Sequence, residues 1–408
     1  MPWPGKPGGP DYRRWGPGYW WQNTRLPYAG LCTSGDFDLL APFHQFYAHD
    51  LRIFSLYRTK HYFGFDDAFY FPEVMHFWGT VFPETYGKTP AAERSDKLQE
   101  SGWHKREWVG ALELSFMLQD YYDHTGDTKF LREILLPTAL PALRFFDRYY
   151  QTGPDGRLFM NPSQALETWW TTTNPMPEIA GLRAVTTRLL ALPTKDLPYA
   201  DRAWLEAFAV KIPDLPALHK NGVHQLAPAA KFEDHHNSEV PELYAVYPFR
   251  LVSFEKLNAA LGIDTLNARG PKGPVAWRQD ELFMAYLGQT DQARDYLIKR
   301  VRNHGENLFG GGRFEMRFPC FWGPGYDWTP DQCHGGMILA ATQAMLIQSE
   351  GGKIFLFPAW PRDWNVDFKL HAPHQTVVEG IVHDGKLLSL KVTPSARRAD
   401  VVVPSAFQ

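Results

Sequence analysis

The sequence predicts a mainly α-helical protein: an (α/α)6 toroid or barrel over residues 1–350, followed by a small β-strand module over residues 351–408. Two observations predict this fold. From about residue 37 to residue 347, apolar residues recur at helical spacing in segments that pair as hairpins. After Gly351-Gly352 the pattern changes to short runs of β-forming residues. Because each helical hairpin must bury its apolar face on its neighbours, a long series of hairpins favours a toroid.

Two helical hairpins follow directly from the pattern. In the first, Trp108–His124 and Phe130–Tyr149 carry apolar residues at helical spacing, and Thr-Gly-Asp turns the chain between them. In the second, Leu282–Leu287 and Ala293–Arg302 flank a polar turn. A further helix is expected over Pro177–Leu190.

The C-terminal part of the chain predicts short strands. Asp384-Gly385 separates two of them and is a strong signal for a tight hairpin turn. We expect strands to be largely confined to residues beyond about 350. The runs expected to form strands are KIFLFP, DFKLHA, TVVEGIV, KLLSLKV and ADVVV.

Charge and hydropathy exclude several classes of partner. The chain has 408 residues, and its 42 Lys and Arg against 45 Asp and Glu give a net charge of −3. No basic tract stands out, so a nucleic-acid partner is not expected. No apolar run approaches the roughly 18 residues of a membrane-spanning helix. The opening MPWPGKPGGP lacks the apolar core of a signal peptide. The chain as given predicts a cytoplasmic protein, or a secreted or periplasmic one if a leader has been removed.

The cysteines predict no metal site. Cys32, Cys320 and Cys333 are odd in number and irregularly spaced, which is typical neither of a disulfide framework nor of a zinc site. Asp234-His235-His236 is the strongest metal-like cluster, but no further ligand set accompanies it. We therefore expect no metal and no cofactor, and the oligomeric state is left open.

Aromatic residues are unusually abundant and point to a saccharide ligand. Phe, Trp and Tyr make up 15% of the chain, which includes 15 Trp. Most of them are expected in the core. Trp169, Trp170 and Trp328 instead flank polar turns, and Trp78 lies in the polar and aromatic segment FPEVMHFWGTVFPET. Ligand sites commonly combine aromatic walls with a few polar groups, and sugar rings stack on aromatic planes.

Two carboxyl groups are the simplest means of cleaving a glycosidic bond, one as proton donor and one as base. Glu167 is the best candidate for the acid because it lies beside Trp169-Trp170, and burial against indoles favours the protonated form. The alternative is a Glu that caps the next helix. Asp331 is the best candidate for the base because it precedes a glycine-containing turn before a helix. The alternative is an ordinary N-cap.

Four segments in order resemble the catalytic domain of family 95 glycoside hydrolases. Trp328–Trp364 resembles the closing segment of that domain, and Asn161–Trp170 resembles its acid loop. Ser238–Pro248 resembles its Leu-Tyr-Gly-Leu-Tyr-Pro segment, and Trp21–Tyr28 more weakly resembles its Asn-rich segment. The matches span nearly the whole chain and are more specific for the superfamily than for a substrate.

The resemblance implies an exo-acting, inverting hydrolase of an oligo- or polysaccharide, similar to α-L-fucosidases and α-L-galactosidases. It places Asp331 where the family carries the acidic residue that activates water. Asn23, with Gln22 beside it, matches the amide that assists the base. Arg25 would bind sugar hydroxyls or form a salt bridge.

One segment departs from the family pattern. Asn237, Glu239 and Glu242 stand where the family usually carries histidines that recognise the sugar. We therefore expect poor activity on simple α-L-fucosides, with these side chains directed into the pocket. The predicted substrate-binding residues are Gln22, Arg25, Trp78, Trp169, Trp170, His236, Asn237, Glu239, Glu242, Trp328 and His334.

Three alternatives remain open. A polysaccharide lyase on a similar toroid would use a Tyr or His base and would release an unsaturated product. A phosphorylase would use inorganic phosphate in place of the water activated by Asp331. A non-catalytic saccharide-binding protein would bind without turnover.

Overall fold

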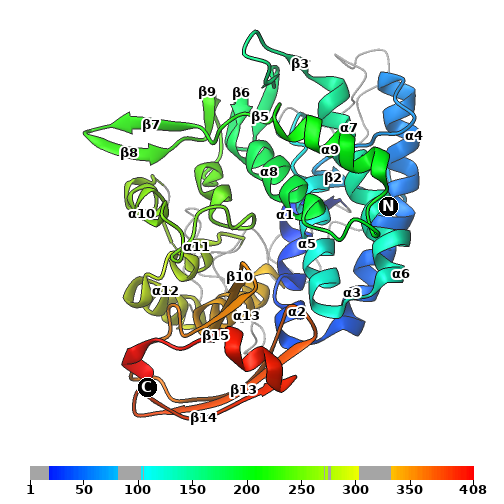
Figure 1. Cartoon of the computed structure of the whole chain (residues 1–408). Coiled ribbons are helices and arrows are strands. Elements are labelled where there is room, and N and C mark those ends of the chain that lie inside the picture. Colours follow the sequence, from blue (N-terminus) through cyan, green and yellow to red (C-terminus); the bar gives the residue numbers. More distant parts are fainter. Residues whose placement is uncertain (1–17, 81–102, 104, 271, 274–276, 303–331) are drawn as a thin grey trace, which may run out of the picture.

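The computed structural model describes residues 18–80, 103, 105–270, 272–273, 277–302 and 332–408. Helices dominate up to residue 346, and strands dominate after it (Figure 1). About half of the described chain is therefore helical, and its C-terminal part is rich in strands, as predicted. Closure of the helices into an (α/α)6 toroid and the domain division at residue 350 remain predictions. The helices are α1 (Trp21–Arg25), α2 (Leu31–Ser34), α3 (Phe37–His44), α4 (Leu51–Phe63), α5 (Gly110–Thr125), α6 (Thr128–Phe130), α7 (Leu136–Tyr149), α8 (Met176–Leu190), α9 (Tyr199–Ala209), α10 (Ala259–Ala268), α11 (Asp280–Tyr286), α12 (Thr290–Arg302) and α13 (Gln332–Leu346).

Both predicted helical hairpins are confirmed. Helix α5 ends at Gly126, which has a φ of 66°. Such a left-handed C-cap suits glycine because it has no Cβ. Asp127 then caps α6 by accepting hydrogen bonds from the backbone N–H groups of Lys129 and Phe130. The chain continues through a π-helical stretch, Leu131–Leu135, into α7. The second hairpin is formed by α11 and α12, and α8 matches the helix predicted after the acid loop.

The C-terminal strands form two three-stranded sheets. The first has the order β10-β11-β15, in which β15 is parallel to β11, and the second is the antiparallel sheet β12-β13-β14. Asp384 and Gly385, both with positive φ, connect β13 to β14 in the predicted hairpin turn. The strands are β10 (Ile347–Glu350), β11 (Lys353–Leu356), β12 (Val366–Ala372), β13 (Thr376–His383), β14 (Lys386–Thr393) and β15 (Val401–Val402).

The expectation that strands lie largely beyond residue 350 is wrong. Nine strands precede α13 in the described residues, including the three-stranded antiparallel sheet β5-β6-β9. The β-branched run in Trp-Trp-Thr-Thr-Thr favours a strand at β6. These strands are β1 (Tyr19–Trp20), β2 (Val74–Met75), β3 (Gln151–Thr152), β4 (Leu158–Phe159), β5 (Ser163–Ala165), β6 (Trp169–Pro175), β7 (Ala217–Lys220), β8 (Val223–Leu226) and β9 (Ala229–His235).

Close helix packing brings distant parts of the chain together around α5. A Cβ at Gly181 of α8 would lie 2.8 Å from side-chain atoms of Leu112 and Phe249, so only glycine allows this approach. A Cβ at Gly336 of α13 would lie 2.5 Å from the backbone oxygen of Leu26. Gly336 therefore lets the N-terminal part of α13 rest on the backbone that follows α1.

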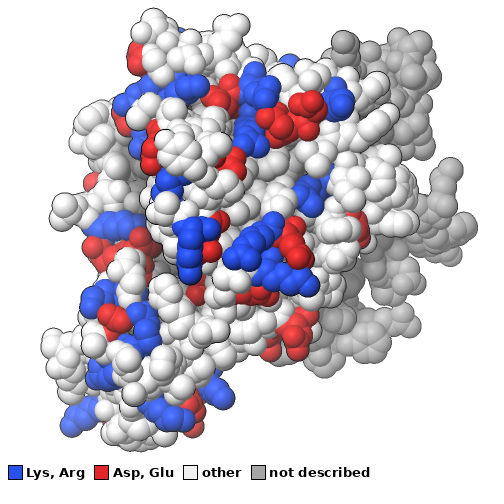
Figure 2. Space-filling view, turned by 45° about the vertical axis from the view of Figure 1, so that its right-hand side comes forward, with Lys and Arg blue, Asp and Glu red and all other residues white. Residues whose placement is uncertain are grey.

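The surface shows no segregation of charge on the face drawn in Figure 2, where basic and acidic side chains are interspersed. This distribution agrees with the net charge of −3. None of the helices in the described parts of the chain is long and apolar enough to cross a membrane.

Candidate active site

Glu167 lies in the turn between β5 and β6, and its carboxylate is held from a distant segment. The preceding residue, Leu166, has a φ of 53°, which bends the chain sharply at this point. The side-chain amide of Asn237 donates a hydrogen bond of 2.9 Å to Oε2 of Glu167. The indole N–H of Trp170 donates to the backbone oxygen of Glu167 at 3.0 Å. Helix α8 begins after Pro175 without a side-chain cap, so Glu167 is not a capping residue.

The hydroxyl group of Thr168 connects the Glu167 turn to the segment after β9 through two hydrogen bonds. The hydroxyl of Thr168 accepts a hydrogen bond of 3.1 Å from the backbone N–H of Glu239 and donates one of 3.0 Å to Oε2 of that residue. The backbone N–H of His236 donates to the backbone oxygen of Thr168 at 2.9 Å. These contacts bring together the Asn161–Trp170 and Ser238–Pro248 segments that the sequence singles out.

The two successive tryptophans of β6 point to opposite faces of the sheet, because side chains alternate between the two faces along a strand. Trp170 stacks on His236, with ring centroids 3.5 Å apart and planes inclined by 20°. Trp103 meets Trp170 edge-on at 5.0 Å. Trp169 instead packs against Phe232 and His235 of β9. Trp170 and His236 therefore form an aromatic wall on the Glu167 side of the turn, and Trp169 does not belong to it.

Buried carboxyl groups surround this site. Burial, followed by the negative charge of Glu167, raises the pKa of Glu239 to about 8. Burial also raises the pKa values of Glu73 and Glu107 well above the usual range, and the carboxyls act on one another. At neutral pH Glu239 therefore holds a proton beside the half-buried Glu167, and burial disfavours the charged forms of Glu73 and Glu107.

Glu107 was missed from the sequence, and Glu73 was noted only as part of a polar loop. Each lies next to bulky aromatic residues in the sequence, in Phe71-Pro72-Glu73 and Glu107-Trp108. A lone Glu within such an apolar stretch is a usable signal of burial, because unpaired carboxyls are costly to bury. The signal does not say which carboxyls meet, since that depends on the tertiary fold.

Arg25 occupies the layer beneath the site. Its guanidinium forms a buried ion pair with Glu113 and donates to the hydroxyl of Tyr244 at 3.0 Å and to the backbone oxygen of Gln22 at 2.5 Å. The indole of Trp21 also donates to Glu113, at 2.6 Å. Of the two roles predicted for Arg25, the structure shows the salt bridge. Its burial, at 3% exposure, does not favour direct sugar binding.

The amide pair Gln22 and Asn23 connects α1 to two other parts of the site. The backbone N–H of Gln22 donates to Oε1 of Glu73 at 2.7 Å, and the side chain of Gln22 lines a small cavity. The amide of Asn23 donates to the sulfur of Cys333 at 3.3 Å. Asn23 therefore contacts the start of α13. Asp331 and Trp328 themselves lie outside the described residues.

The small cavity has a volume of about 20 Å³, enough for a water molecule but not for a sugar ring. Its lining residues include Glu239, Tyr244, Trp277 and Arg278. A sugar next to Glu167 would have to sit outside this cavity, on the side of the aromatic wall. The cavity itself has the size and polar lining for a bound water.

The remaining predicted residues are not brought into this cluster. Burial raises the pKa of Glu242 to about 7, and the charges of Arg269 and Lys220 oppose the shift, so this carboxyl faces α10 and the β7–β8 hairpin. His334 is buried near Arg300, and burial lowers its pKa to about 4. Trp78 is exposed on the turn after β2 and stacks on His76. The structure brings together Gln22, Glu167, Trp170, His236, Asn237 and Glu239.

This arrangement is suited to proton transfer. The half-buried carboxyl group of Glu167 lies beside buried carboxyls whose pKa values are raised by burial, and the amide of Asn237 fixes its orientation. General acid catalysis needs a proton donor held in place near the reacting bond. Neighbouring aromatic rings are suited to exclude water and to contact an apolar ring face.

Comparison with known proteins gives a likeness to solved structures but not to a family. No family model matches the chain, and no curated protein matches it. Among solved structures, the chain is similar to one described as "Putative kojibiose phosphorylase from human microbiome", with 11% sequence identity and a TM-score of 0.47. The superposition covers 90% of this chain and 55% of that chain, so this chain spans about half of its length. The resemblance to family 95 remains a prediction.

Proposed function

We propose that this protein is a carbohydrate-active enzyme that hydrolyses a glycosidic bond of an oligo- or polysaccharide, with Glu167 as general acid. The observation that carries the proposal is the Asn237–Glu167 hydrogen bond beside the stacked rings of Trp170 and His236. Together they give an oriented carboxyl next to an aromatic surface. In this account Asp331 is the base that activates water, with Asn23 as the assisting amide, and the reaction is exo-acting and inverting.

The carboxyl-rich surroundings favour a neutral substrate. Glu73, Glu107 and Glu239 disfavour further negative charge next to Glu167, as their raised pKa values indicate. A lyase acts on a uronate and needs a basic environment for its carboxylate. Tyr244 has an arginine beside it, but burial raises its pKa well above the usual range and makes it a poor base. Hydrolysis of a neutral glycoside is therefore preferred over elimination.

Phosphorolysis is a second candidate because of Arg278. This residue lines the small cavity together with Gln22 and Glu239, and its Nη2 donates to the hydroxyl of Ser238 at 2.9 Å. Its Nε has no hydrogen-bond partner among the described residues. An arginine with a spare donor next to an acid is a plausible phosphate ligand. In that case phosphate replaces the water activated by Asp331.

A single assay separates these functions. The full chain is incubated with a panel of nitrophenyl glycosides and oligosaccharides, with and without inorganic phosphate, and the products are resolved by anomer. Free sugar formed without phosphate, with inverted configuration, supports hydrolysis. A sugar phosphate formed only with phosphate shows phosphorolysis, an ultraviolet-absorbing unsaturated product shows a lyase, and binding without turnover shows a binding protein.

A further inference from the structure

A second cavity lies at the junction of the helices and the C-terminal strands. It has a volume of about 430 Å³ and is lined by the C-terminal parts of α5 and α8, by the β10–β11 turn and by the loop between β12 and β13. The loop docks on α5 through hydrogen bonds from the backbone N–H groups of His374 and Gln375 to the oxygens of Asp123 and His124, at 2.6 and 3.0 Å. These hydrogen bonds hold the β12–β13 loop against the end of α5, at the edge of the cavity.

This junction cavity is separate from the candidate active site. Glu113, which pairs with Arg25 beneath that site, and Asp120, which lines the junction cavity, are both on α5. Seven residues of helix separate them, or about 10 Å along the axis. No residue of the cluster around Glu167 lines the junction cavity.

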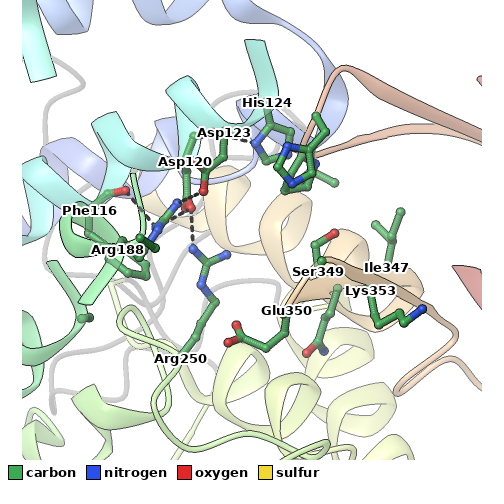
Figure 3. Close-up of a pocket in the computed structure, with 18 of the residues that line it drawn as sticks. Phe116, Asp120, Asp123, His124, Arg188, Arg250, Ile347, Ser349, Glu350 and Lys353 are labelled. Carbon is green, nitrogen blue, oxygen red and sulfur yellow. Dashed lines mark hydrogen bonds and ion pairs between the residues drawn. The ribbon is translucent and has the colours of Figure 1, made fainter. Parts of the chain in front are cut away.

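One wall of the junction cavity is a network of two arginines and two aspartates (Figure 3). Asp120 forms ion pairs with Arg188 at 2.9 Å and with Arg250 at 2.5 Å. Arg188 also forms an ion pair with Asp123 at 2.6 Å. Both guanidinium groups also lie over the ring of Phe116, at 4.5 and 4.7 Å from its centre. The four charged side chains retain 21–37% exposure, so their polar atoms are oriented by one another and still accessible.

The opposite wall carries a second ion pair. Lys256 lies 3.3 Å from Glu350 at the end of β10, and these side chains are 28% and 41% exposed. In Figure 3, Glu350 and Ser349 lie across the cavity from the Arg188–Asp120 network. The turn that follows Glu350 consists of Gly351 and Gly352, where an added Cβ would meet no atom within 4 Å. The cavity is therefore open next to this wall.

The balance of charge decides the class of ligand. Arg188 and Arg250 are matched by Asp120 and Asp123, and Lys256 is matched by Glu350. The two other cations of the lining, Lys353 and Arg397, both pair with Asp400. A free anion or cation would have to break one of these pairs, at the cost of leaving a charge without its partner. A neutral ligand with several hydroxyl groups can donate to the carboxylates and accept from the cations while every pair stays intact.

We propose that the junction cavity is a non-catalytic binding site for a neutral sugar of one or two rings. Its volume falls within the roughly 300–1,000 Å³ typical of small-molecule sites. The fixed Arg–Asp pairs present donors and acceptors at set spacing, which suits the adjacent hydroxyls of a sugar ring. The site is chemically independent of the Glu167 assignment, because none of its residues takes part in the proposed reaction.

The test measures sugar binding to the full chain by isothermal titration and saturation-transfer NMR. The probes are D-glucose, D-galactose, L-fucose and their common disaccharides, with inorganic phosphate and citrate as anionic comparators. The double variant Lys256→Gln/Glu350→Gln removes the ion pair but keeps the size of both side chains. Ser349→Phe fills the cavity instead. Trp170→Ala is the control, since it alters only the wall of the candidate active site.

The proposal expects at least one neutral sugar to bind with millimolar affinity. This binding should weaken at least tenfold in the double variant and in Ser349→Phe, and should persist in Trp170→Ala. It is overturned if no probe binds, if only phosphate or citrate binds, or if sugar binding is lost in Trp170→Ala and unchanged in the junction variants. Loss of turnover in Glu167→Gln leaves this result unaffected, so the two proposals can fail separately.

Discussion

Asn237 donates a hydrogen bond of 2.9 Å to the carboxylate of Glu167, across 70 residues of sequence. The amide therefore fixes the direction in which that carboxylate points. Because Asn237 stands where the family that the chain resembles usually carries a histidine, the substitution keeps a hydrogen-bond donor but removes an ionisable group. This relationship connects the two sequence segments from which the active site was predicted.

Replacing Asn237 should impair catalysis more than folding. A hydrogen bond to a charged group contributes about 1.5–3 kcal/mol. We expect Asn237→Ala to lower kcat by about tenfold or more, on the best substrate of the glycoside panel. Asn365→Ala is a matched control, because Asn365 accepts a hydrogen bond from the backbone of Asp384 in the C-terminal sheet. Equal kcat values for the two variants would contradict a role for Asn237 in orienting the acid.

The two neighbouring tryptophans of β6 should behave differently. Trp170 faces the Glu167 side and stacks on His236, whereas Trp169 packs on Phe232. We expect Trp170→Ala to raise KM at least fivefold, because about 1 kcal/mol of aromatic contact with the sugar is removed. Trp169→Ala should lower thermal stability and leave KM nearly unchanged. Steady-state kinetics with thermal unfolding checks both, and the opposite pattern would place the sugar on the other face of β6.

The Arg25–Glu113 pair should be a structural element. Removing one partner of a buried ion pair typically costs about 3–5 kcal/mol, because the other charge is left uncompensated. We expect Arg25→Met to lower the free energy of unfolding by about this amount, and the double variant Arg25→Met/Glu113→Gln to recover part of the loss. Urea unfolding measures both. A stable Arg25→Met variant with a raised KM would instead support the alternative prediction, in which Arg25 binds the sugar.

Stability should fall as the pH rises from about 5 to about 8 because of Glu239. Its folded pKa is about 8 and lies above that of the unfolded chain, so the folded state binds more protons in this window. Each such group lowers the free energy of unfolding by up to about 1.4 kcal/mol per pH unit. Glu239→Gln, which resembles the protonated form, should flatten the fall. Glu379→Gln is the control and should leave the slope unchanged, because the hydrogen bond from Lys391 lowers the pKa of Glu379, away from this window. A slope that Glu239→Gln does not alter would argue against a protonated Glu239 in the folded state.

Local features of the fold could be predicted from the sequence. The α5–α7 hairpin and the Asp384-Gly385 turn depend on signals within a few residues, namely helical spacing and a residue pair that tolerates positive φ. Strand β6 was not predicted, because only its first two residues, Trp169 and Trp170, were considered, as part of the acid loop. In a strand of a small sheet, pairing with β9 decides the conformation, and that partner lies more than 50 residues away.

The active site could be predicted only in part for the same reason. Glu167, Asn237 and Glu239 were found because each lies in a segment that resembles a known family. The sequence could not show that Glu242, three residues after Glu239, faces Arg269 and Lys220 instead. The sequence also could not show that Trp169 and Trp170 point to opposite faces. That difference follows from the alternation of side chains along a strand, and no strand was predicted here.

The most direct test of the account is the turnover of Glu167→Gln compared with wild type on the substrate found in the panel, with the product anomer followed in time. A general acid typically contributes about 10²–10⁴-fold, so we predict that kcat falls by at least a hundredfold while sugar binding and thermal stability stay close to wild type. Wild type should release the inverted anomer without phosphate, and Asp331→Asn should show a similar loss. Near-native turnover by Glu167→Gln would contradict the account.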